Sequence, residues 1–307
     1  MFKYTLDNKR YYTLNYYYKT KYNSKVFKVS LNANFGCPNK KNGGGCIYCL
    51  NGSGENRGMD LIEQFIKVRD IMSKKWPDSK YIGYFQADTN TYAPLEVLKE
   101  NYEKILKLDN VVGLNIATRC DCLPNDVLDY LEELNKRTNL TIELGLQTIH
   151  ETTSKLINRG HTLKQFENAV LELRKRNINV VVHVINGLPY ETKEMMLETI
   201  KYVSHLDIQG IKIHMLFVLK GTELEKLYKK EKFHILTREE YVDIVCDELE
   251  LLREDIVINR ITGDPDKNLV IEPTWLIKKF GVLNEIDKEM ERRNSYQGIK
   301  YEDILDK

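Results

Sequence analysis

The sequence predicts an α/β fold built around a parallel β-sheet. Short apolar runs alternate with amphipathic stretches through much of the 307-residue chain. The apolar runs are continuous in Val, Ile and Leu rather than alternating with polar residues, which is typical of strands covered on both faces. Strands and helices that alternate at this spacing form right-handed βαβ units, so consecutive strands are expected to be parallel.

Six strands are expected along the chain, with helices between them. The predicted strands are residues 26–33, 80–86, 111–117, 140–146, 179–185 and 210–217. The predicted helices are residues 60–75, 95–107, 124–136, 163–176 and 192–205. Several helices begin at a capping signal, such as Asp60 and Pro124. Six such strands can form an open doubly wound sheet or a partial barrel, and periodicity alone does not choose between them.

The chain is expected to divide into three parts. Residues 1–25 form a basic, tyrosine-rich N-terminal strap, and residues 26–221 form the core, which contains a cysteine-bearing loop at 34–50. Residues 222–307 form a C-terminal extension packed on the core. In this extension we expect helices at 237–253 and 273–292 and a short strand near 256–261.

Composition is that of an ordinary globular protein, with 42% hydrophobic and 30% charged residues. No apolar run approaches the roughly 18 residues that a membrane-spanning helix needs. The N-terminus lacks the apolar core of a secretory signal, so we expect a cytoplasmic protein with no membrane partner. Six cysteines in such a chain are not expected to form disulfides. A net charge of +1 gives the whole molecule no strong attraction for polyanions.

Three cysteines directly after the first strand form the most specific pattern in the sequence. Cys37, Cys46 and Cys49 have the spacing C-x8-C-x2-C, and the glycines at 43–45 allow the backbone to wrap around a metal centre. A structural zinc site closes with four protein ligands, whereas three thiolates leave one position of an iron–sulfur cluster open for another ligand. The spacing therefore favours a cluster. A zinc site completed by Cys120, Cys122 or His183 remains the alternative.

This loop resembles the cluster-binding loop of the radical S-adenosylmethionine (SAM) superfamily. Tyr48 occupies the position of the aromatic residue before the last cysteine, while the first gap of eight residues departs from the usual three. The resemblance implies a partial (βα)6 barrel of the TIM type with a helical C-terminal extension. It also implies that a [4Fe–4S] cluster bound by Cys37, Cys46 and Cys49 holds SAM. Reductive cleavage of SAM then gives a 5′-deoxyadenosyl radical, for which a flavodoxin- or ferredoxin-type protein supplies the electron.

Further segments at the strand ends resemble motifs of the elongator catalytic subunit and of oxygen-independent coproporphyrinogen oxidase. They are A-T-R-C-D at 117–121, G-L-Q followed by N-R at 145–159, and H-V-I-N-G-L-P at 183–189. The resemblance implies a set of SAM-binding residues and two residues that contact substrate. The SAM-binding set is Tyr48, Gln86, Ala87, Asp88, Thr118, Gln147, Arg159 and His183, and the substrate contacts are Arg119 and His214. Cys120 and Cys122 form a second sulfur site or, more simply, two small packed residues.

The C-terminal segments L-T-R-E-E-Y, I-N-R-I-T-G-D and R-R-N-S-Y-Q-G resemble the YhcC/YtqA-like (MnmL-like) branch of the superfamily. That resemblance implies an enzyme that converts the carboxymethylaminomethyl group of a tRNA wobble uridine to aminomethyl. A tRNA is then the expected partner, with a downstream tRNA methyltransferase as a further one. Tyr16 and Tyr17, among basic residues of the strap, are candidates for stacking on its bases. Three alternatives stay open: a strap that only packs on the barrel, radical chemistry on a small metabolite, and a zinc-stabilised RNA-binding module without catalysis.

Overall fold

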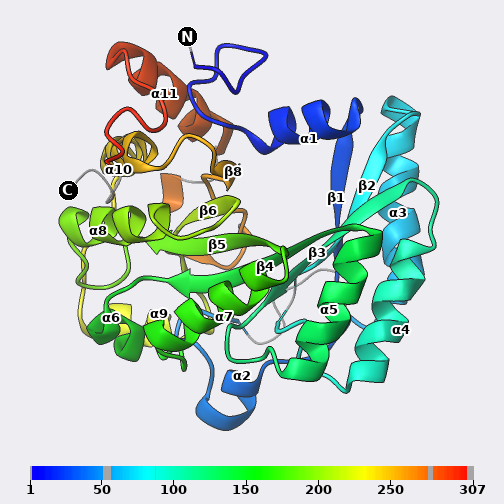
Figure 1. Ribbon diagram of the computed structural model, residues 1–307. Helices are drawn as coiled ribbons and strands as arrows, with labels where there is room; N and C mark the ends of the chain where they lie inside the picture. Colours follow the sequence, from blue (N-terminus) through cyan, green and yellow to red (C-terminus); the bar gives the residue numbers. More distant parts are fainter. Residues whose placement is uncertain (1, 51–56, 87, 276–278, 303–307) are drawn as a thin grey trace.

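A seven-stranded parallel sheet forms the centre of the computed structural model, which describes residues 2–50, 57–86, 88–275 and 279–302 (Figure 1). Its strands are β1 (Val26–Leu31), β2 (Lys80–Phe85), β3 (Val111–Thr118), β4 (Asn139–Gln147), β5 (Asn179–Asn186), β6 (Gly210–Met215) and β8 (Val257–Arg260). The strands lie in chain order and every neighbouring pair is parallel. A doubly wound sheet would reverse its strand order. The sheet is therefore the predicted partial barrel, and its seventh strand, β8, is the short strand predicted near 256–261 in the C-terminal extension.

All the predicted helices are present, and the structure adds shorter elements that periodicity did not indicate. The predicted ones are α3 (Leu61–Lys75), α4 (Leu95–Leu106), α5 (Asn125–Arg137), α7 (Leu163–Lys175), α8 (Lys193–Ser204), α10 (Arg238–Leu251) and α11 (Lys279–Arg292). The additional helices are α1 (Leu14–Tyr22), α2 (Pro38–Gly43), α6 (Glu151–Leu156) and α9 (Glu223–Lys230). Two short strands, β7 (Val218–Leu219) and β9 (Val270–Glu272), pair antiparallel beside the main sheet.

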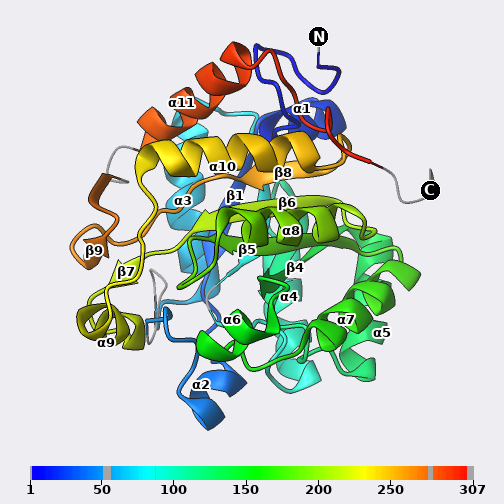
Figure 2. The ribbon, with the colours of Figure 1, turned by 90° about the vertical axis from the view of Figure 1, so that its left-hand side faces the viewer.

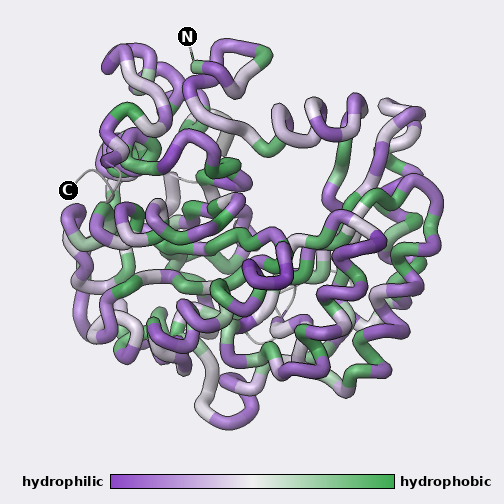
Figure 3. Tube along the Cα trace, viewed as in Figure 1, coloured by the Kyte–Doolittle hydropathy of each residue, from purple (hydrophilic) through white to green (hydrophobic). Residues whose placement is uncertain are grey.

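One face of the sheet is apolar and covered by helices. α3, α4, α5, α7 and α8 pack against it, as Figures 1 and 2 show from two sides. Side chains on this face such as Phe85, Leu114 and Val182 are fully buried. A Cβ at Gly83 would lie 2.5 Å from a methyl group of Ile105 on α4, so glycine lets the helix approach the strand. Figure 3 shows the hydrophobic residues concentrated along the central strands, while the helices mix both kinds.

The other face of the sheet is neither apolar nor fully covered, which corrects the expectation that both faces are buried. Ser30 is exposed, and Ala117, Gly145, His183 and Ile185 keep part of their surface accessible. The strands looked continuously apolar because several inward positions carry small or apolar residues between the polar ones. The inner face of the curled sheet is therefore open to solvent along part of its length.

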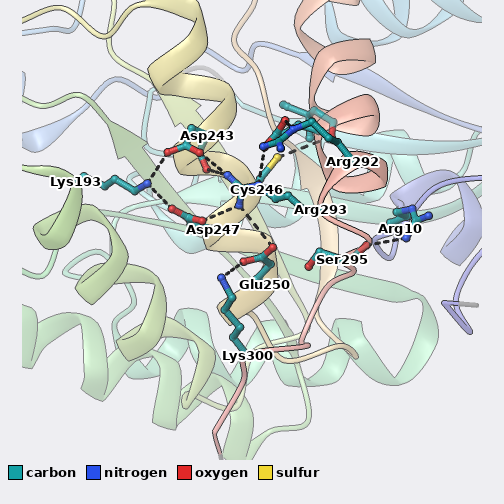
Figure 4. Close-up of polar contacts among 12 residues, drawn as sticks. Arg10, Lys193, Asp243, Cys246, Asp247, Glu250, Arg292, Arg293, Ser295 and Lys300 are labelled. Carbon is teal, nitrogen blue, oxygen red and sulfur yellow. Dashed lines mark hydrogen bonds and ion pairs between the residues drawn. The ribbon is translucent and has the colours of Figure 1, made fainter.

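The C-terminal residues are joined to the core at several points. β8 pairs with β6 and extends the sheet, while α10 packs on α8 and α11. Figure 4 shows a charged network beside these helices, in which Arg293, the residue after α11, pairs with Asp243 and Asp247 of α10. Lys193 joins the same two carboxylates. Lys300 forms an ion pair with the buried Glu250. The three-part division of the chain stays a prediction.

The N-terminal strap lies on the C-terminal extension. The amide of Ile258 in β8 donates to the carbonyl of Tyr12 (2.7 Å), and the amide of Gln297 donates to that of Arg10 (2.9 Å). α1 follows and begins at Thr13, whose hydroxyl accepts from the amide of Tyr16. In the part of the chain that the structure describes, no helix is long and apolar enough to cross a bilayer.

Candidate functional site

The three cysteines lie on one loop at the carboxyl end of β1. Cys37 is extended and caps α2, whose first residue is proline. Gly44 and Gly45 then have φ values of +77° and +83°, which reverse the chain toward Cys46. The amide of Cys49 donates to the carbonyl of Cys46 at 2.9 Å, so that these two residues form one tight turn. The glycine run therefore does what the sequence indicated: it folds the loop back so that the cysteines share it.

Within the loop, Cys46 is the cysteine whose surroundings favour a thiolate, while its hydrogen bond with Cys49 raises the pKa of the Cys49 thiol. A hydrogen bond from the Cys49 thiol, aided by Tyr48 and by the charge of Arg119, lowers the pKa of Cys46 to about 6. The amide nitrogen of Asn39 lies 3.6 Å from the Cys46 sulfur. Among the described residues, no three His, Cys, Asp or Glu side chains are gathered closely enough to hold a single metal ion. Three cysteine thiols on one loop are the donor set that a [4Fe–4S] cluster with one open position takes.

The segment between β4 and α7 holds the cysteine loop in place. The amide nitrogen of Asn158 donates to the carbonyls of Gly43 and Gly45, both at 2.7 Å. In return, Asn39 donates to the carbonyl of Asn158 at 2.7 Å. A Cβ at Gly160 would lie 2.5 Å from the Asn39 side chain, so only glycine fits there. Sequence reasoning selected Arg159 from this segment but missed Asn158, although an asparagine with positive φ is a recognisable turn residue.

Arg159 is 1% exposed and lies beside the loop. It donates to three carbonyls: those of Leu146 (2.8 Å) and Thr148 (2.6 Å) from Nη1, and that of His161 (3.0 Å) from Nε. Its Nη2 has no hydrogen-bond partner, and the Glu151 carboxylate lies 3.5 Å away.

Burial lowers the pKa of Arg159, and the side chains of Tyr48 and Cys46 are near enough for their charges to act on it. A buried guanidinium whose Nη2 makes no hydrogen bond, and only a 3.5 Å ion pair with Glu151, fits an anionic ligand such as the carboxylate of SAM.

The segment after β3 also turns toward the loop. Arg119 donates to the carbonyl of Arg159 (2.8 Å) and makes a two-point pair with Asp121 (2.9 and 2.8 Å). Burial raises the pKa of both Cys120 and Cys122 to about 12, which makes them poor metal ligands. The packed-residue interpretation of these two cysteines is the one that their surroundings favour.

The other predicted SAM-binding residues lie in different surroundings. Asp88 has a φ of +61° and pairs with Lys40 of α2 at 2.7 Å, which ties the turn after β2 to the cysteine loop. Gln86 is exposed, and Ala87 lies outside the described residues. Thr118 is buried, with its hydroxyl 2.6 Å from that of Thr91, so it already has a partner.

Gln147 ends β4 in an unusual conformation. Its φ is +67°, and the register of β4 against β5 shifts between Gly145 and Gln147. A Cβ at Gly145 would lie 2.7 Å from the Gln147 amide nitrogen, so the side chain folds back over that glycine. Backbone strain at a non-glycine residue persists where the surroundings enforce it, and it is common at binding sites.

His183 and His214 belong to a different group, on the inner face of the sheet. His183 Nε2 lies 2.9 Å from the Glu143 carboxylate, and the ring of His214 is 5.4 Å from that of His183. Glu143 is fully buried and also pairs with Lys28 (3.0 Å) and with Lys212. Sequence reasoning missed these three charged residues. The signal was available, because charged side chains inside apolar strands are rarely buried without a reason.

Tyr16 and Tyr17 lie at the opposite end of the sheet. α1 sits over the amino-terminal ends of the strands, where Tyr22 reaches the carbonyl of Val112 (3.5 Å) and Lys21 reaches Asn139. Figure 1 shows α1 at the top and α2 at the bottom of the molecule. The rings of Tyr16 and Tyr17 contact that of Tyr12 rather than the cysteine loop. The structure therefore does not bring these two tyrosines together with the cysteines.

Comparison with known protein families agrees with this geometry. Residues 31–203 match the family described as the Radical SAM superfamily, and residues 208–292 match the Radical_SAM C-terminal domain. The chain is 52% identical over 304 residues to YtqA of Bacillus subtilis (97% of this chain, 94% of YtqA). It is 30% identical over 275 residues to YhcC of Escherichia coli (87% of this chain, 88% of YhcC).

More distant relatives have names that refer to tRNA. A tRNA uridine(34) acetyltransferase of Methanocaldococcus infernus is 24% identical over 208 residues, which cover 65% of this chain and 38% of that protein. The solved structure of the archaeal Methanocaldococcus infernus Elp3 superposes with a TM-score of 0.70 at 18% identity, covering 89% of this chain and 64% of that one. At this identity the superposition supports the fold, which is the same partial barrel.

Proposed function

Because the chain belongs to the radical SAM superfamily, we propose that it is a radical enzyme acting on the wobble uridine of a tRNA. The family's cofactors are a [4Fe–4S] cluster and SAM, which together supply a 5′-deoxyadenosyl radical on one-electron reduction. In this chain, Cys37, Cys46 and Cys49 hold the cluster, and the residues around them bind SAM. The observation that carries the proposal is the buried Arg159 beside the cysteine loop, with its unused Nη2 donor.

The protein's own residues then have distinct tasks. Asn158 and Asn39 fix the shape of the loop, so the thiolates are in place before any ligand arrives. Arg159 supplies a cation for a carboxylate, and Gln147 and Gln86 stand at the ends of β4 and β2 with amide groups for the nucleoside part of SAM. Asp88 and Thr118 contribute through the turns that they hold.

The substrate assignment draws on the relatives. Proteins named tRNA uridine(34) acetyltransferase share part of this chain's sequence, so a tRNA with uridine at the wobble position is the proposed substrate. The reaction proposed is conversion of a carboxymethylaminomethyl group to aminomethyl. A flavodoxin- or ferredoxin-type protein is the proposed electron donor, a tRNA methyltransferase the proposed consumer of the product, and the cytoplasm the proposed location.

Anaerobic reconstitution with iron and sulfide tests the cluster. We expect the wild-type chain to take up about four irons and turn brown, and Cys46→Ala to lose the chromophore. Cys122→Ala is the matched control, because Cys122 is a buried thiol on a neighbouring loop and should keep the iron. Colourless wild-type protein holding one zinc ion would reject the proposal. A brown protein that leaves the nucleosides of tRNA unchanged would reject the substrate assignment alone.

A further inference from the structure

A layer of polar side chains crosses the inner face of the sheet, and the proposed cofactor site does not use most of it. Every one of the seven strands contributes a member. The layer consists of Lys28, Tyr84, Asn115, Glu143, His183, Lys212, His214 and Arg260. Tyr84 is the sheet partner of Asn115, His183 is the partner of Lys212, and Lys212 is the partner of Arg260. Lys28 and Glu143 are each offset by two residues from their neighbours in the layer, so the layer crosses the sheet in steps.

Glu143 is the centre of the layer. Its two oxygens accept from Lys28 (3.0 Å), Asn115 (2.8 Å) and His183 (2.9 Å), and from Lys212. Lys212 also donates to the hydroxyl of Tyr84 at 2.7 Å. One carboxylate therefore holds two lysines in fixed positions on the inner face.

The layer has hydrogen-bonding capacity left over. An ammonium carries three donors. Lys28 makes one hydrogen bond among the described residues and Lys212 makes two, so both have donors to spare. Asn115 is 1% exposed, and its Oδ1 has no partner. Buried polar atoms without partners are rare in folded proteins, and each calls for a ligand or a water.

The charge of the layer is positive. Lys28, Lys212 and Arg260 are accompanied in the layer by a single carboxylate, that of Glu143. His183 adds no charge, because burial lowers its pKa to about 4 and keeps the ring neutral. Burial also lowers the pKa of Lys212 to about 7, so a further negative charge nearby would stabilise its protonated form. Arg260 is exposed, forms no ion pair within the described part of the chain, and is near enough for its charge to act on Lys212 and His214.

The two ends of the layer are covered differently. Tyr18 of α1 is buried and lies near enough to Glu143 for that charge to act on it, so α1 covers the amino-terminal end. Toward the other end, Gly145 and His183 remain partly accessible. Glu143 and Gln147 are four residues apart on one strand, or roughly 13 Å. A nucleoside that enters from the cysteine-loop end would thus extend its substituent toward the layer.

We propose that this layer is the substrate pocket and that Lys28, Lys212 and Arg260 bind a carboxylate on the group being modified, while the unpartnered Asn115 oxygen accepts from an adjacent N–H. The inference rests on the proposed function, since a carboxymethylaminomethyl substituent offers a carboxylate with an amine next to it. Phosphates are less suited to this site, because the layer lies in the middle of the strands rather than on the outer surface.

Binding without turnover tests the pocket. The probe is an anticodon stem-loop RNA with 5-carboxymethylaminomethyluridine at the wobble position, and its partner is the same RNA with the carboxylate converted to a carboxamide. We expect the wild-type chain to bind the carboxylate RNA about tenfold more tightly, and Lys212→Met and Arg260→Gln each to remove most of that difference. Affinity for the carboxamide RNA should stay unchanged.

Arg260→Gln protects the test against misfolding, because Arg260 is exposed and unpaired in the described residues. Lys74→Gln, an exposed lysine on the outer helix α3, is the matched charge control and should keep the full preference. A preference for the carboxylate that persists in both pocket variants, or no preference in the wild type, overturns the pocket and leaves the tRNA assignment standing.

A second probe separates the pocket from the proposed function. If the wild type binds neither RNA but binds N-methylglycine more tightly than N-methylglycinamide, and Arg260→Gln abolishes that difference, the pocket holds and the tRNA assignment fails. If the wild type binds neither RNA and does not distinguish N-methylglycine from its amide, both are overturned. Isothermal titration of the full-length chain gives all the required affinities.

Discussion

Two buried glutamates of this chain have opposite electrostatic surroundings. Burial alone would raise the pKa of Glu143, but Lys212, Lys28 and His183 together hold it well below the usual value. Among the described residues, no cation forms an ion pair with Glu248 on α10. Burial raises its pKa to about 8, although one oxygen accepts from the Asn186 amide at 2.9 Å. Glu143 is therefore ionised and holds its neighbours in place, whereas Glu248 is a neutral acid at pH 7.

The neutral Glu248 makes stability depend on pH. Its pKa is higher in the folded state than in the unfolded state, so its contribution is complete below about pH 4.5 and is lost as the pH rises toward 8. We expect Glu248→Gln, which is neutral at every pH, to stabilise the chain at pH 7 by on the order of 2 kcal/mol. The gain should vanish near pH 4.5.

Chemical unfolding of wild type and Glu248→Gln at several pH values measures this effect. Glu239→Gln, an exposed glutamate at the start of the same helix, serves as the control and should change little at any pH. An equal effect of Glu248→Gln at pH 4.5 and pH 8 would show that the carboxyl group is not protonated by burial.

At the level of elements, the sequence was sufficient to predict those helices and strands that bury one whole face. The strands and the long helices were predicted because their apolar residues recur with a regular period. α2 and α6 are too short for a period to be visible, and contacts distant in sequence stabilise them. For α9 a signal was present: Thr222 accepts from the amide of Glu225 in the usual helix-start pattern.

The candidate site shows the same limit. Cys37, Cys46 and Cys49 could be found because the ligands are close in sequence. The polar layer could not be assembled in this way, because Lys28 and Lys212 meet Glu143 only after β1, β4 and β6 have curled into one sheet. Which side chains of distant strands meet depends on how the strands are aligned in the sheet, and no local sequence pattern encodes that alignment.

The cysteine loop and the β4–α7 segment act as one unit, and Asn158 joins them. Asn158→Ala removes two hydrogen bonds to the loop, at roughly 1 kcal/mol each, and places alanine at a φ of +52°. We expect the reconstituted variant to lose its iron to a chelator several-fold faster than wild type. The decay of the brown absorbance under anaerobic conditions measures the rate.

Backbone strain must be separated from the loss of the contact. Asn110→Ala is matched for this purpose, since Asn110 has a φ of +63° in an exposed turn before β3, outside the loop. Both variants place alanine at a similar positive φ and should carry a similar backbone strain, and only Asn158→Ala should release iron faster. Equal rates of iron loss in the two variants would mean that the two hydrogen bonds do not hold the loop.

For the whole molecule, the distribution of charge decides how an RNA can bind. The chain carries 46 basic and 45 acidic residues, and many of the surface charges are paired with one another along the helices. The strap has an excess of basic residues, but it lies at the end of the barrel away from the cysteine loop. Near the cysteine loop, the exposed Lys41, Lys155 and Lys220 form no ion pair within the described residues, so a tRNA that brings its wobble base there meets a small group of unpaired cations.

This balance predicts a weak dependence of RNA affinity on salt. Each phosphate contact contributes about −0.7 to −0.9 to the slope of log K against log salt concentration. With two to four contacts around the mouth of the barrel, we expect a slope of roughly −2 to −3 for the modified anticodon stem-loop. Fluorescence anisotropy at salt concentrations between about 50 and 300 mM measures this slope. A slope steeper than about −6 would mean that the RNA makes many more phosphate contacts than the two to four expected here. Tight, salt-independent binding of a small carboxylate with no affinity for RNA would instead assign the same radical chemistry to a metabolite.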